Sequence, residues 1–242
     1  MSAAGCGDPR LGGHRPPLQT PTQPSTPVAC PARDAYNEGV KKKSQARAAL
    51  RKAAEARLPT RYGAFRIVGL ENGRRQWLVA LLKGNLGRAA APLVRIHSQC
   101  LTGDVFCSER CDCRAQLELS LKAIARAGAG AVLYEPQEGR GSGLINKLRA
   151  YALQDRGWDT VEANRRLGFP ADRRNYALAG AALRLLGLKR VRLLSNNPDK
   201  VAALERAGIE VVERVPCQPA PSRGTRSYLR VKKAKLGHLL QV

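Results

Sequence analysis

Short apolar runs alternate with helix-like segments along most of the chain, and this alternation constrains the fold more than any other feature. From Leu58 onward, runs of branched and aliphatic residues bounded by glycine or proline are typical of β-strands. Amphipathic segments, several of them ending at a glycine, are typical of helices. The expected strands cover 64–70, 77–83, 92–98, 130–135, 189–195 and 209–215, and the expected helices 115–128, 144–156, 174–187 and 198–208. The pattern predicts an α/β fold with a mixed, mostly parallel sheet flanked by helices.

The first 57 residues differ in composition from the remainder. Residues 1–35 contain seven prolines and almost no bulky aliphatic side chains, so they bury too little apolar surface to offset the entropy of ordering. We expect them to be disordered. Residues 41–57 contain seven basic residues and one glutamate among alanines, which predicts a solvated basic helix or an arm that touches RNA or a membrane. We therefore divide the chain into a largely disordered extension, 1–57, and a catalytic domain, 58–242.

The charge balance favours an anionic partner without identifying it. Lysine and arginine number 42 against 19 acidic residues, which gives a formal net charge of +23. No run approaches the roughly 18 apolar residues of a membrane span, which excludes an integral membrane protein. The N-terminus has no basic stretch followed by an apolar run, so we expect no secretory signal and a reducing, cytoplasmic location. The tail, 223–242, has six basic residues and no acidic one. It is expected either to be mobile or to close over an anion.

Three of the seven cysteines form the strongest chemical motif. Cys100, Cys111 and Cys113 have the spacing C-x10-C-x-C, and thiolates are soft ligands that bind zinc tightly. Three protein ligands leave a coordination position for water, as catalytic zinc requires. A fourth ligand, either Cys107 or His97, would instead close a structural site. An odd number of cysteines does not suit a disulfide framework.

Three further motifs favour a phosphorylated ligand only weakly. The glycine-rich run 137–143 precedes a helix, where backbone N–H groups favour anions, although it could equally be a plain turn. Glu138 within it could accept hydrogen bonds from purine N–H groups. Lys200 is expected in the first turn of a helix, where it either binds phosphate or is simply solvated. Asp172 and Arg174 precede another helix, a pattern most often due to capping by the aspartate.

Together these motifs resemble the GTP cyclohydrolase II family, the zinc enzymes that open the guanine ring of GTP in riboflavin biosynthesis. The resemblance covers roughly residues 58–242. We expect the fused dihydroxybutanone-phosphate synthase domain of bifunctional forms to be absent, since 57 preceding residues cannot encode it. The matching stretches, in family order, are VRIHSQCLTGDVF, RCDC, LYEPQEGRGSGLINKLRAYALQDRGWDTVEAN, LGFPADRRNY, VRLLSNNPDK, ERVPC and KLGHLL.

The resemblance implies a reaction and a set of residue roles. GTP would be hydrolysed to 2,5-diamino-6-(5-phosphoribosylamino)pyrimidin-4(3H)-one, formate and pyrophosphate, with one Zn²⁺ per subunit and Mg²⁺ on the triphosphate. The three motif cysteines match the zinc ligands. Asp172 matches the proton acceptor, Arg174 the proposed nucleophile on the α-phosphate, and Tyr151 a tyrosine important for ring hydrolysis. The positions that match GTP contacts are Arg95, Ile96, His97, Ser98, Gln99, Gln116, Glu138, Gly139, Arg140, Thr160, Ser195 and Lys200. The resemblance also implies a homodimer.

Some expectations stay open at this stage. A guanidinium is protonated at ordinary pH, so Arg174 could stabilise phosphoryl charge rather than attack phosphorus. Gln99 stands where the family usually has glutamate, Arg114 where it has glycine, and Ser142 where an aliphatic residue is common. These departures leave one alternative, a divergent enzyme of a secondary pathway that stops at pyrophosphate release or at a formylated product. A nucleic-acid-binding relative is a further alternative, which rests on net charge alone, and we do not expect nucleic acid to be the partner.

Overall fold

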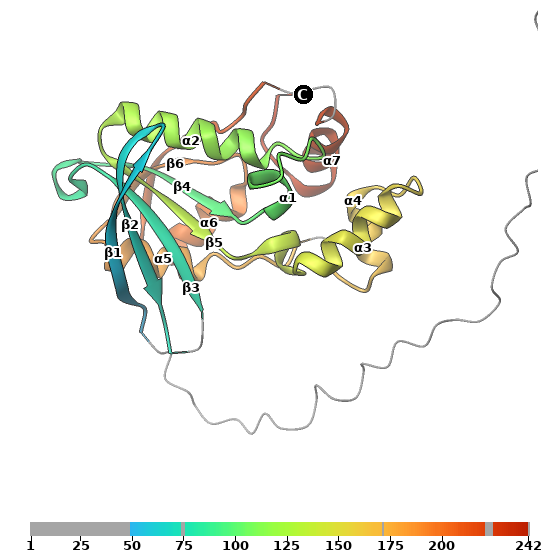
Figure 1. Ribbon diagram of the computed structural model, residues 1–242, viewed down its shortest axis with the longest axis horizontal. Helices are drawn as coiled ribbons and strands as arrows, with labels where there is room; N and C mark the ends of the chain where they lie inside the picture. The colour runs from blue at the N-terminus through green and yellow to red at the C-terminus, as the bar shows by residue number, and fades with distance from the viewer. Residues whose placement is uncertain (1–48, 74–75, 171, 221–224, 242) are drawn as a thin grey trace, which may run out of the picture. The chain divides into compact units, whose positions relative to one another are not determined.

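The computed structural model describes residues 49–242 except 74–75, 171, 221–224 and 242 (Figure 1). The strands are β1 (Arg51–Thr60), β2 (Gly63–Glu71), β3 (Trp77–Lys83), β4 (Leu93–Ser98), β5 (Gly130–Glu135), β6 (Arg190–Leu194) and β7 (Glu210–Val215). The helices are α1 (Leu101–Asp104), α2 (Cys113–Ala127), α3 (Leu144–Gln154), α4 (Thr160–Arg166), α5 (Ala177–Leu185), α6 (Pro198–Arg206) and α7 (Arg226–Leu236), with short 3-10 helices η1 (Leu86–Arg88) and η2 (Glu138–Gly141).

The seven strands form one mixed sheet in the order β1-β2-β3-β5-β4-β6-β7. The pairs β1–β2, β2–β3 and β3–β5 are antiparallel, whereas β5–β4, β4–β6 and β6–β7 are parallel. The prediction of an α/β sheet flanked by helices is confirmed. Because β4, β5 and β6 run in the same direction, their carboxyl ends meet at one edge of the sheet. Ligands of open α/β sheets bind at such edges.

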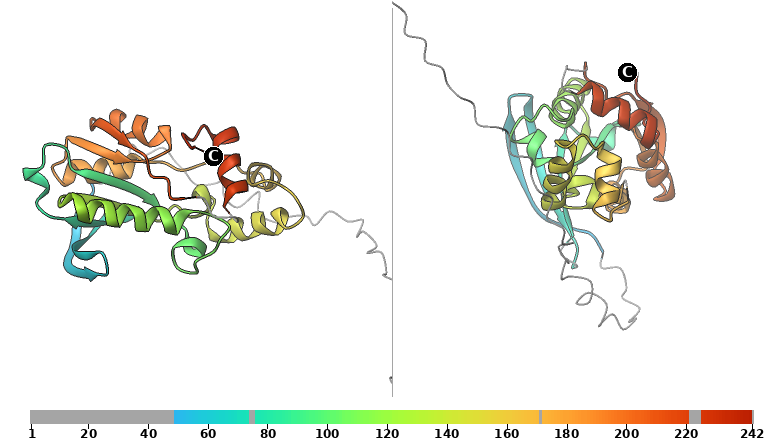
Figure 2. Two further views of the ribbon diagram at one scale, coloured as in Figure 1. Left: turned by 90° about the horizontal axis from the view of Figure 1, so that it is seen from above. Right: turned by 90° about the vertical axis from the view of Figure 1, so that its right-hand side faces the viewer.

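Helices cover both faces of the sheet, and alternate strand residues contact each layer (Figure 2). Ile96 and Leu133 face one side, where they pack with Leu183 of α5. Leu93 and Val132 face the other side and pack with residues of α2, among them Leu121 and Ile124. Burying each such aliphatic side chain contributes about 1.5–3 kcal/mol. These two apolar layers hold the strand ends in a fixed relation to the helices that follow them.

Local signals place the helix ends close to where the sequence predicts them. The Asn197 side chain accepts a hydrogen bond from the backbone N–H of Asp199, and Pro198 occupies the first turn of α6. Helix α2 is followed by Gly128, which adopts the left-handed φ of +75° that commonly terminates a helix. The expected helices 115–128, 144–156, 174–187 and 198–208 correspond to α2, α3, α5 and α6.

The interpretation of residues 41–57 as a basic helix is wrong where the structure describes them. Residues 51–60 form β1, which pairs with β2 along its length, so tertiary pairing overrides the helix propensity of the alanines. The disordered segment expected over 1–35, and residues 41–48, lie outside the described residues. Within the tail, which was expected either to be mobile or to close over an anion, residues Arg226–Leu236 form the helix α7. No helix in the described part of the chain is long and apolar enough to cross a membrane.

Candidate active site

Three cysteine sulfur atoms converge at the carboxyl end of β4. Cys100 follows β4, Cys111 precedes α2, and Cys113 is the first residue of α2, and their Sγ atoms lie within 4.8 Å of one another. A Cβ at Gly103 would lie 3.0 Å from the sulfur of Cys111 and 3.2 Å from that of Cys100. A side chain at this position would therefore press on the sulfur atoms and require them to shift. Among the described residues, the group includes neither Cys107 nor His97, the two suggested fourth ligands.

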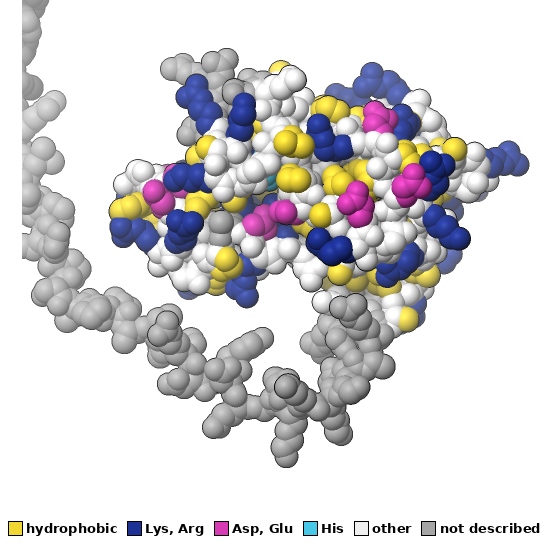
Figure 3. Space-filling view, turned by 180° about the vertical axis from the view of Figure 1, so that it is seen from behind, with side chains coloured by type: hydrophobic (Ala, Val, Ile, Leu, Met, Phe, Trp, Pro, Cys, Tyr) yellow, Lys and Arg dark blue, Asp and Glu magenta, His cyan; other side chains and the backbone are white. Residues whose placement is uncertain are grey.

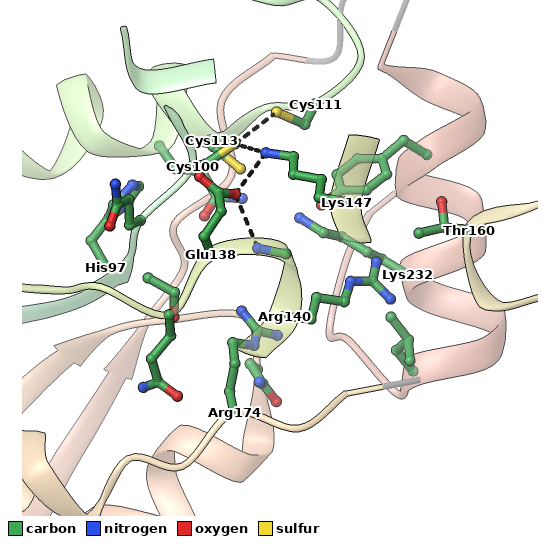
Figure 4. A pocket seen from close by; sticks show the side chains of 18 of the residues that line it. His97, Cys100, Cys111, Cys113, Glu138, Arg140, Lys147, Thr160, Arg174 and Lys232 are labelled. Carbon is green, nitrogen blue, oxygen red and sulfur yellow. Dashed lines mark hydrogen bonds and ion pairs between the residues drawn. The ribbon is translucent and has the colours of Figure 1, made fainter. Parts of the chain in front are cut away.

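Lys147 and Glu138 flank the sulfur cluster (Figure 4). Lys147 Nζ lies 3.1 Å from the sulfur of Cys100 and 2.8 Å from Glu138 Oε1. The Glu138 carboxylate also accepts hydrogen bonds from the backbone N–H groups of Leu101 and Gly139. Hydrogen bonds with the other two thiols, and the nearby Lys147 ammonium, hold the pKa of the Cys100 thiol well below its usual value. The arrangement favours a thiolate at this position.

Asp104 fixes the loop that carries Cys100. Its carboxylate accepts hydrogen bonds from the Cys100 backbone N–H at 3.0 Å and the Tyr134 hydroxyl at 3.0 Å, and it lies 3.1 Å from His97 Nε2. The His97 ring stacks on Tyr134 and is only 2% exposed. Burial lowers the pKa of His97 despite the carboxylate beside it. The histidine therefore orients the loop through Asp104.

A cavity opens beside the sulfur atoms, with about 1100 Å³ of space including its solvent-open mouth. Seven cationic side chains from different parts of the chain line it: Arg95, Arg110, Arg140, Lys147, Arg174, Lys200 and Lys232. Such a concentration of positive charge suits a polyanionic ligand.

Lys200 is held in the cavity wall by the strand it faces. Its Nζ donates a hydrogen bond of 2.7 Å to the backbone carbonyl of Ile96, and its ammonium lies 5.2 Å from the centre of the Tyr176 ring. The side chain is buried, and burial lowers its pKa. A buried ammonium with few polar partners gains from an anion that enters the cavity.

Asp172 and Arg174 form a bidentate ion pair at the opposite side of the cavity from the sulfur atoms. Arg174 Nε lies 3.0 Å from both carboxylate oxygens, and a second nitrogen of the guanidinium lies 2.5 Å from one of them. Although burial opposes ionisation, the guanidinium lowers the pKa of Asp172. The same carboxylate raises the pKa of the buried Arg174. Both groups are therefore charged at neutral pH.

The tail forms part of the cavity wall. Tyr228 and Lys232 of α7, together with His238 after it, line this wall, where α7 packs next to α4. Lys232 and Thr160, the first residue of α4, are labelled in Figure 4. The Leu239 backbone N–H donates to the Asn196 carbonyl at 2.9 Å, which ties the tail to the loop after β6. Burial lowers the pKa of His238 to about 3, so the imidazole is neutral at physiological pH.

Comparison with known proteins identifies the family. Residues 51–216 match the family model described as GTP cyclohydrolase II. The chain belongs to this family.

Two relatives of the GTP cyclohydrolase II chain are more than half identical to it. The riboflavin biosynthesis protein RibBA of Bacillus cereus is 53% identical over 190 residues, which are 78% of this chain and 48% of that protein. The riboflavin biosynthesis protein VVA0006 of Vibrio vulnificus is 54% identical over 185 residues, or 76% and 50% of the two chains. The chain thus spans about half the length of these relatives. A solved structure of RibBX, a two-domain 3,4-dihydroxy-2-butanone 4-phosphate synthase from A. baumannii, covers 61% of this chain and 34% of that one. At 16% identity and a TM-score of 0.36, that likeness is too weak to indicate a shared fold.

The structure brings most of the residues suggested by the GTP cyclohydrolase II resemblance to one cavity. Every one of them lines it except Ile96, whose side chain is buried in the core, and Asp172, which reaches the site through Arg174. Sequence patterns did not indicate several other lining residues. The polar ones among them are Arg110, Gln137, Lys147, Gln154, Asn164, Asn196, Asn197, Tyr228, Lys232 and His238. Lys147 had one usable signal, since it lies on the turn of α3 nearest the glycine-rich loop.

Proposed function

We propose that the chain hydrolyses GTP, opening the guanine imidazole ring to give 2,5-diamino-6-(5-phosphoribosylamino)pyrimidin-4(3H)-one with release of formate and pyrophosphate. One observation carries this proposal. Three convergent thiols lie in the wall of a cavity that is otherwise lined by cations, in a chain of the GTP cyclohydrolase II family. Thiols are unsuited to binding phosphate, and cations are unsuited to binding a metal. The combination therefore fits a substrate with an anionic end and an end that reacts at a metal.

The donor set fits zinc. Three thiolates form a soft ligand set, and the missing side chain at Gly103 leaves the sulfur atoms free to approach one ion. Within the described residues no fourth protein ligand joins them, which is the pattern of catalytic sites. When bound, zinc would supply Lewis acidity and activate water toward the ring carbon. Mg²⁺ would accompany the triphosphate and spread its charge.

The remaining residues would bind the two ends of GTP. Lys200, Arg174 and Arg140 supply positive charge for the triphosphate, and the fixed guanidinium of Arg174 stabilises charge on the α-phosphate rather than attacking it. Asp172, which its ion pair with Arg174 keeps ionised, would accept a proton, the role that its position in the family implies. Tyr151, whose hydroxyl lies 3.3 Å from that of Thr102, would orient the ring beside the sulfur cluster.

Glu138 has a different role from the one its position in the glycine-rich loop suggested. Its side chain is 9% exposed, and its carboxylate accepts hydrogen bonds from Lys147 and from two backbone N–H groups. Few of its lone pairs are left for purine N–H groups. We assign it to the support of Lys147 and of the loop, while Gln99, Gln116 and Ser195 contribute polar contacts to the nucleoside.

Incubation of the zinc-loaded protein with GTP and Mg²⁺ tests the proposal. Formate, pyrophosphate and the diaminopyrimidine, identified by mass spectrometry, are the expected products. Release of pyrophosphate without formate, or a formylated product, would instead support the divergent enzyme. Gln99 lies directly before Cys100 in the cavity wall, so Gln99→Glu should then restore the full reaction. Absence of all three products from the metal-loaded protein would refute both activities.

Nucleic acid binding has less support than GTP hydrolysis. On the face shown in Figure 3, lysine and arginine side chains are spread over the surface among acidic ones and do not form one stripe. Nucleic-acid-binding surfaces usually concentrate such charge along a groove or a helix. Tight, salt-sensitive RNA binding that survives loss of the three cysteines would favour this alternative.

The relatives support a proposal for the pathway in which the reaction takes place. The two named above are riboflavin biosynthesis proteins, and we propose that this chain serves the same pathway. We further propose a cytoplasmic homodimer, in keeping with the family. Size-exclusion chromatography with light scattering would determine the oligomeric state.

A further inference from the structure

Lys147 makes an unusual contact for a lysine in a phosphate-binding cavity. Its ammonium is directed at the sulfur of Cys100, at 3.1 Å, and at Glu138 Oε1, at 2.8 Å. The side chain is only 11% exposed, and Glu138 is 9% exposed. Within the part of the chain that the structure describes, no other lysine or arginine donates to a sulfur of the Cys100, Cys111 and Cys113 group.

Helix α3 and the anchored Glu138 carboxylate fix the contact between Lys147 and Cys100. Lys147 lies on α3, which begins directly after the glycine-rich loop, and its backbone N–H donates to the Gly143 carbonyl. Glu138 is anchored by the backbone N–H groups of Leu101 and Gly139. The Glu138 carboxylate is therefore fixed in position, and its hydrogen bond to Lys147 holds the ammonium beside the sulfur of Cys100.

We propose that Lys147 is a positioning residue of the metal centre, which donates an N–H···S hydrogen bond to the Cys100 thiolate and so sets its strength as a ligand. The inference rests on the proposed zinc site. Three thiolates and a divalent ion carry one net negative charge, which weakens the Lewis acidity of the ion. A hydrogen bond from a cation withdraws electron density from one sulfur and offsets that charge. Partners of this kind commonly change metal affinity or activity by 10–100-fold.

Cobalt substitution gives a readout that does not depend on turnover. Co²⁺ bound by thiolates has a sulfur-to-metal charge-transfer band in the near ultraviolet, and its energy depends on the electron density at sulfur. In Lys147→Met the band should move to longer wavelength, and Zn²⁺ affinity, measured against a chromophoric chelator, should fall about tenfold or more. Lys147→Arg retains a cationic donor and should restore most of both properties.

Two matched variants separate the hydrogen bond from simpler explanations. Arg149→Met removes an equal charge from the exposed face of α3, where the guanidinium contacts Asn146, and should leave the spectrum unchanged. Glu138→Gln removes the charge of the ion pair, but its amide oxygen can still accept a hydrogen bond from Lys147 and hold the N–H···S contact, so its band should stay near that of the wild type. Thermal unfolding of each variant confirms that it is folded.

Each outcome bears on one proposal or the other. An unshifted band and unchanged affinity in folded Lys147→Met would overturn the role of Lys147 while leaving the metal site intact. Equal shifts in Lys147→Met and Glu138→Gln would also overturn it, because the ion pair alone would then explain them. If the wild-type protein binds neither Co²⁺ nor Zn²⁺ through its thiols, the metal centre of the proposed function fails as well.

Discussion

Lys232 Nζ lies 3.0 Å from Asp112 Oδ1, and both side chains are buried. Asp112 separates Cys111 from Cys113, so this ion pair joins the tail helix α7 to the segment that carries two of the three sulfur atoms. The carboxylate also accepts a hydrogen bond from Gln116. Burial opposes the charge on Asp112, but the nearby ammonium and the hydrogen bonds lower its pKa overall. The tail and the sulfur cluster are thus coupled through one buried pair.

Replacing Lys232 by methionine should destabilise the protein by about 3 kcal/mol, because an unpaired carboxylate would remain buried at Asp112. Urea unfolding followed by circular dichroism measures this loss. The double variant with Asp112→Asn should recover part of it, since no buried charge is then left without a partner.

Lys235→Met is the matched control on the same helix. Lys235 pairs with Asp159 at an exposed position, where ion pairs contribute about 0–1 kcal/mol. Equal losses in the Lys232 and Lys235 variants would contradict the coupling between α7 and the sulfur segment.

Much of the fold could be predicted because its signals are local. Strand β5 is a continuous apolar run, and α6 has an asparagine cap, a proline in its first turn and a glycine beyond its end. Strand β1 carries no such signal. Nearly all its residues are exposed, so it lacks the alternation of a half-buried strand, and its alanines favour a helix when considered alone. Its conformation is decided by pairing with β2.

The site residues likewise differ in whether a local sequence pattern indicates them. The sulfur cluster was predictable because its three members lie within fourteen residues and their chemistry is specific. Lys147 meets Cys100 across 47 positions, and Lys232 meets Asp112 across 120. An isolated lysine has no pattern that distinguishes it from a solvated one. Such contacts follow only from the tertiary structure, in which β4 and β5 are parallel neighbours whose carboxyl ends lie side by side.

Cys111→Ser should abolish tight zinc binding and ring opening, because a serine hydroxyl is a poor replacement for a thiolate ligand. Some pyrophosphate release should persist, since the cationic wall of the cavity is unchanged. Metal analysis of the purified variant, with separate assays for formate and pyrophosphate, checks this. Cys107→Ser is the control, as Cys107 is exposed and outside the sulfur cluster. A fully active zinc-free Cys111 variant would refute the metal assignment.

Asp172→Asn should lower kcat by roughly 10²–10⁴-fold, the range typical of a lost general base. The amide can still accept one hydrogen bond from Arg174, so KM for GTP should change far less. Steady-state kinetics of formate release gives both constants. The matched loss of a carboxylate at Glu213, which is exposed on β7, should leave both near the wild-type values. A larger change in KM than in kcat would instead indicate that Asp172 only positions the guanidinium.

Glu135 should make the stability of the protein depend on pH. It is 1% exposed at the end of β5, and burial raises its pKa to about 7 from 4.5, although Lys200 and Arg174 nearby oppose the shift. Between pH 4.5 and 7 the folded state therefore keeps a proton that the unfolded chain has lost. Stability must fall as pH rises through this window and level off above it, by about 3 kcal/mol in total.

Glu135→Gln removes this titration, and its amide can still occupy the position beside Gln137. The variant should gain stability relative to the wild type as pH rises from 5 to 8, with little difference at pH 5. Urea unfolding at several pH values measures the two curves. Glu210→Gln, at an exposed ion pair with Arg190, should instead follow the wild-type pH dependence. Parallel curves for the wild type and Glu135→Gln would contradict this prediction. They would mean that the pKa of Glu135 is the same in the folded and unfolded states, because Lys200 and Arg174 offset the effect of burial.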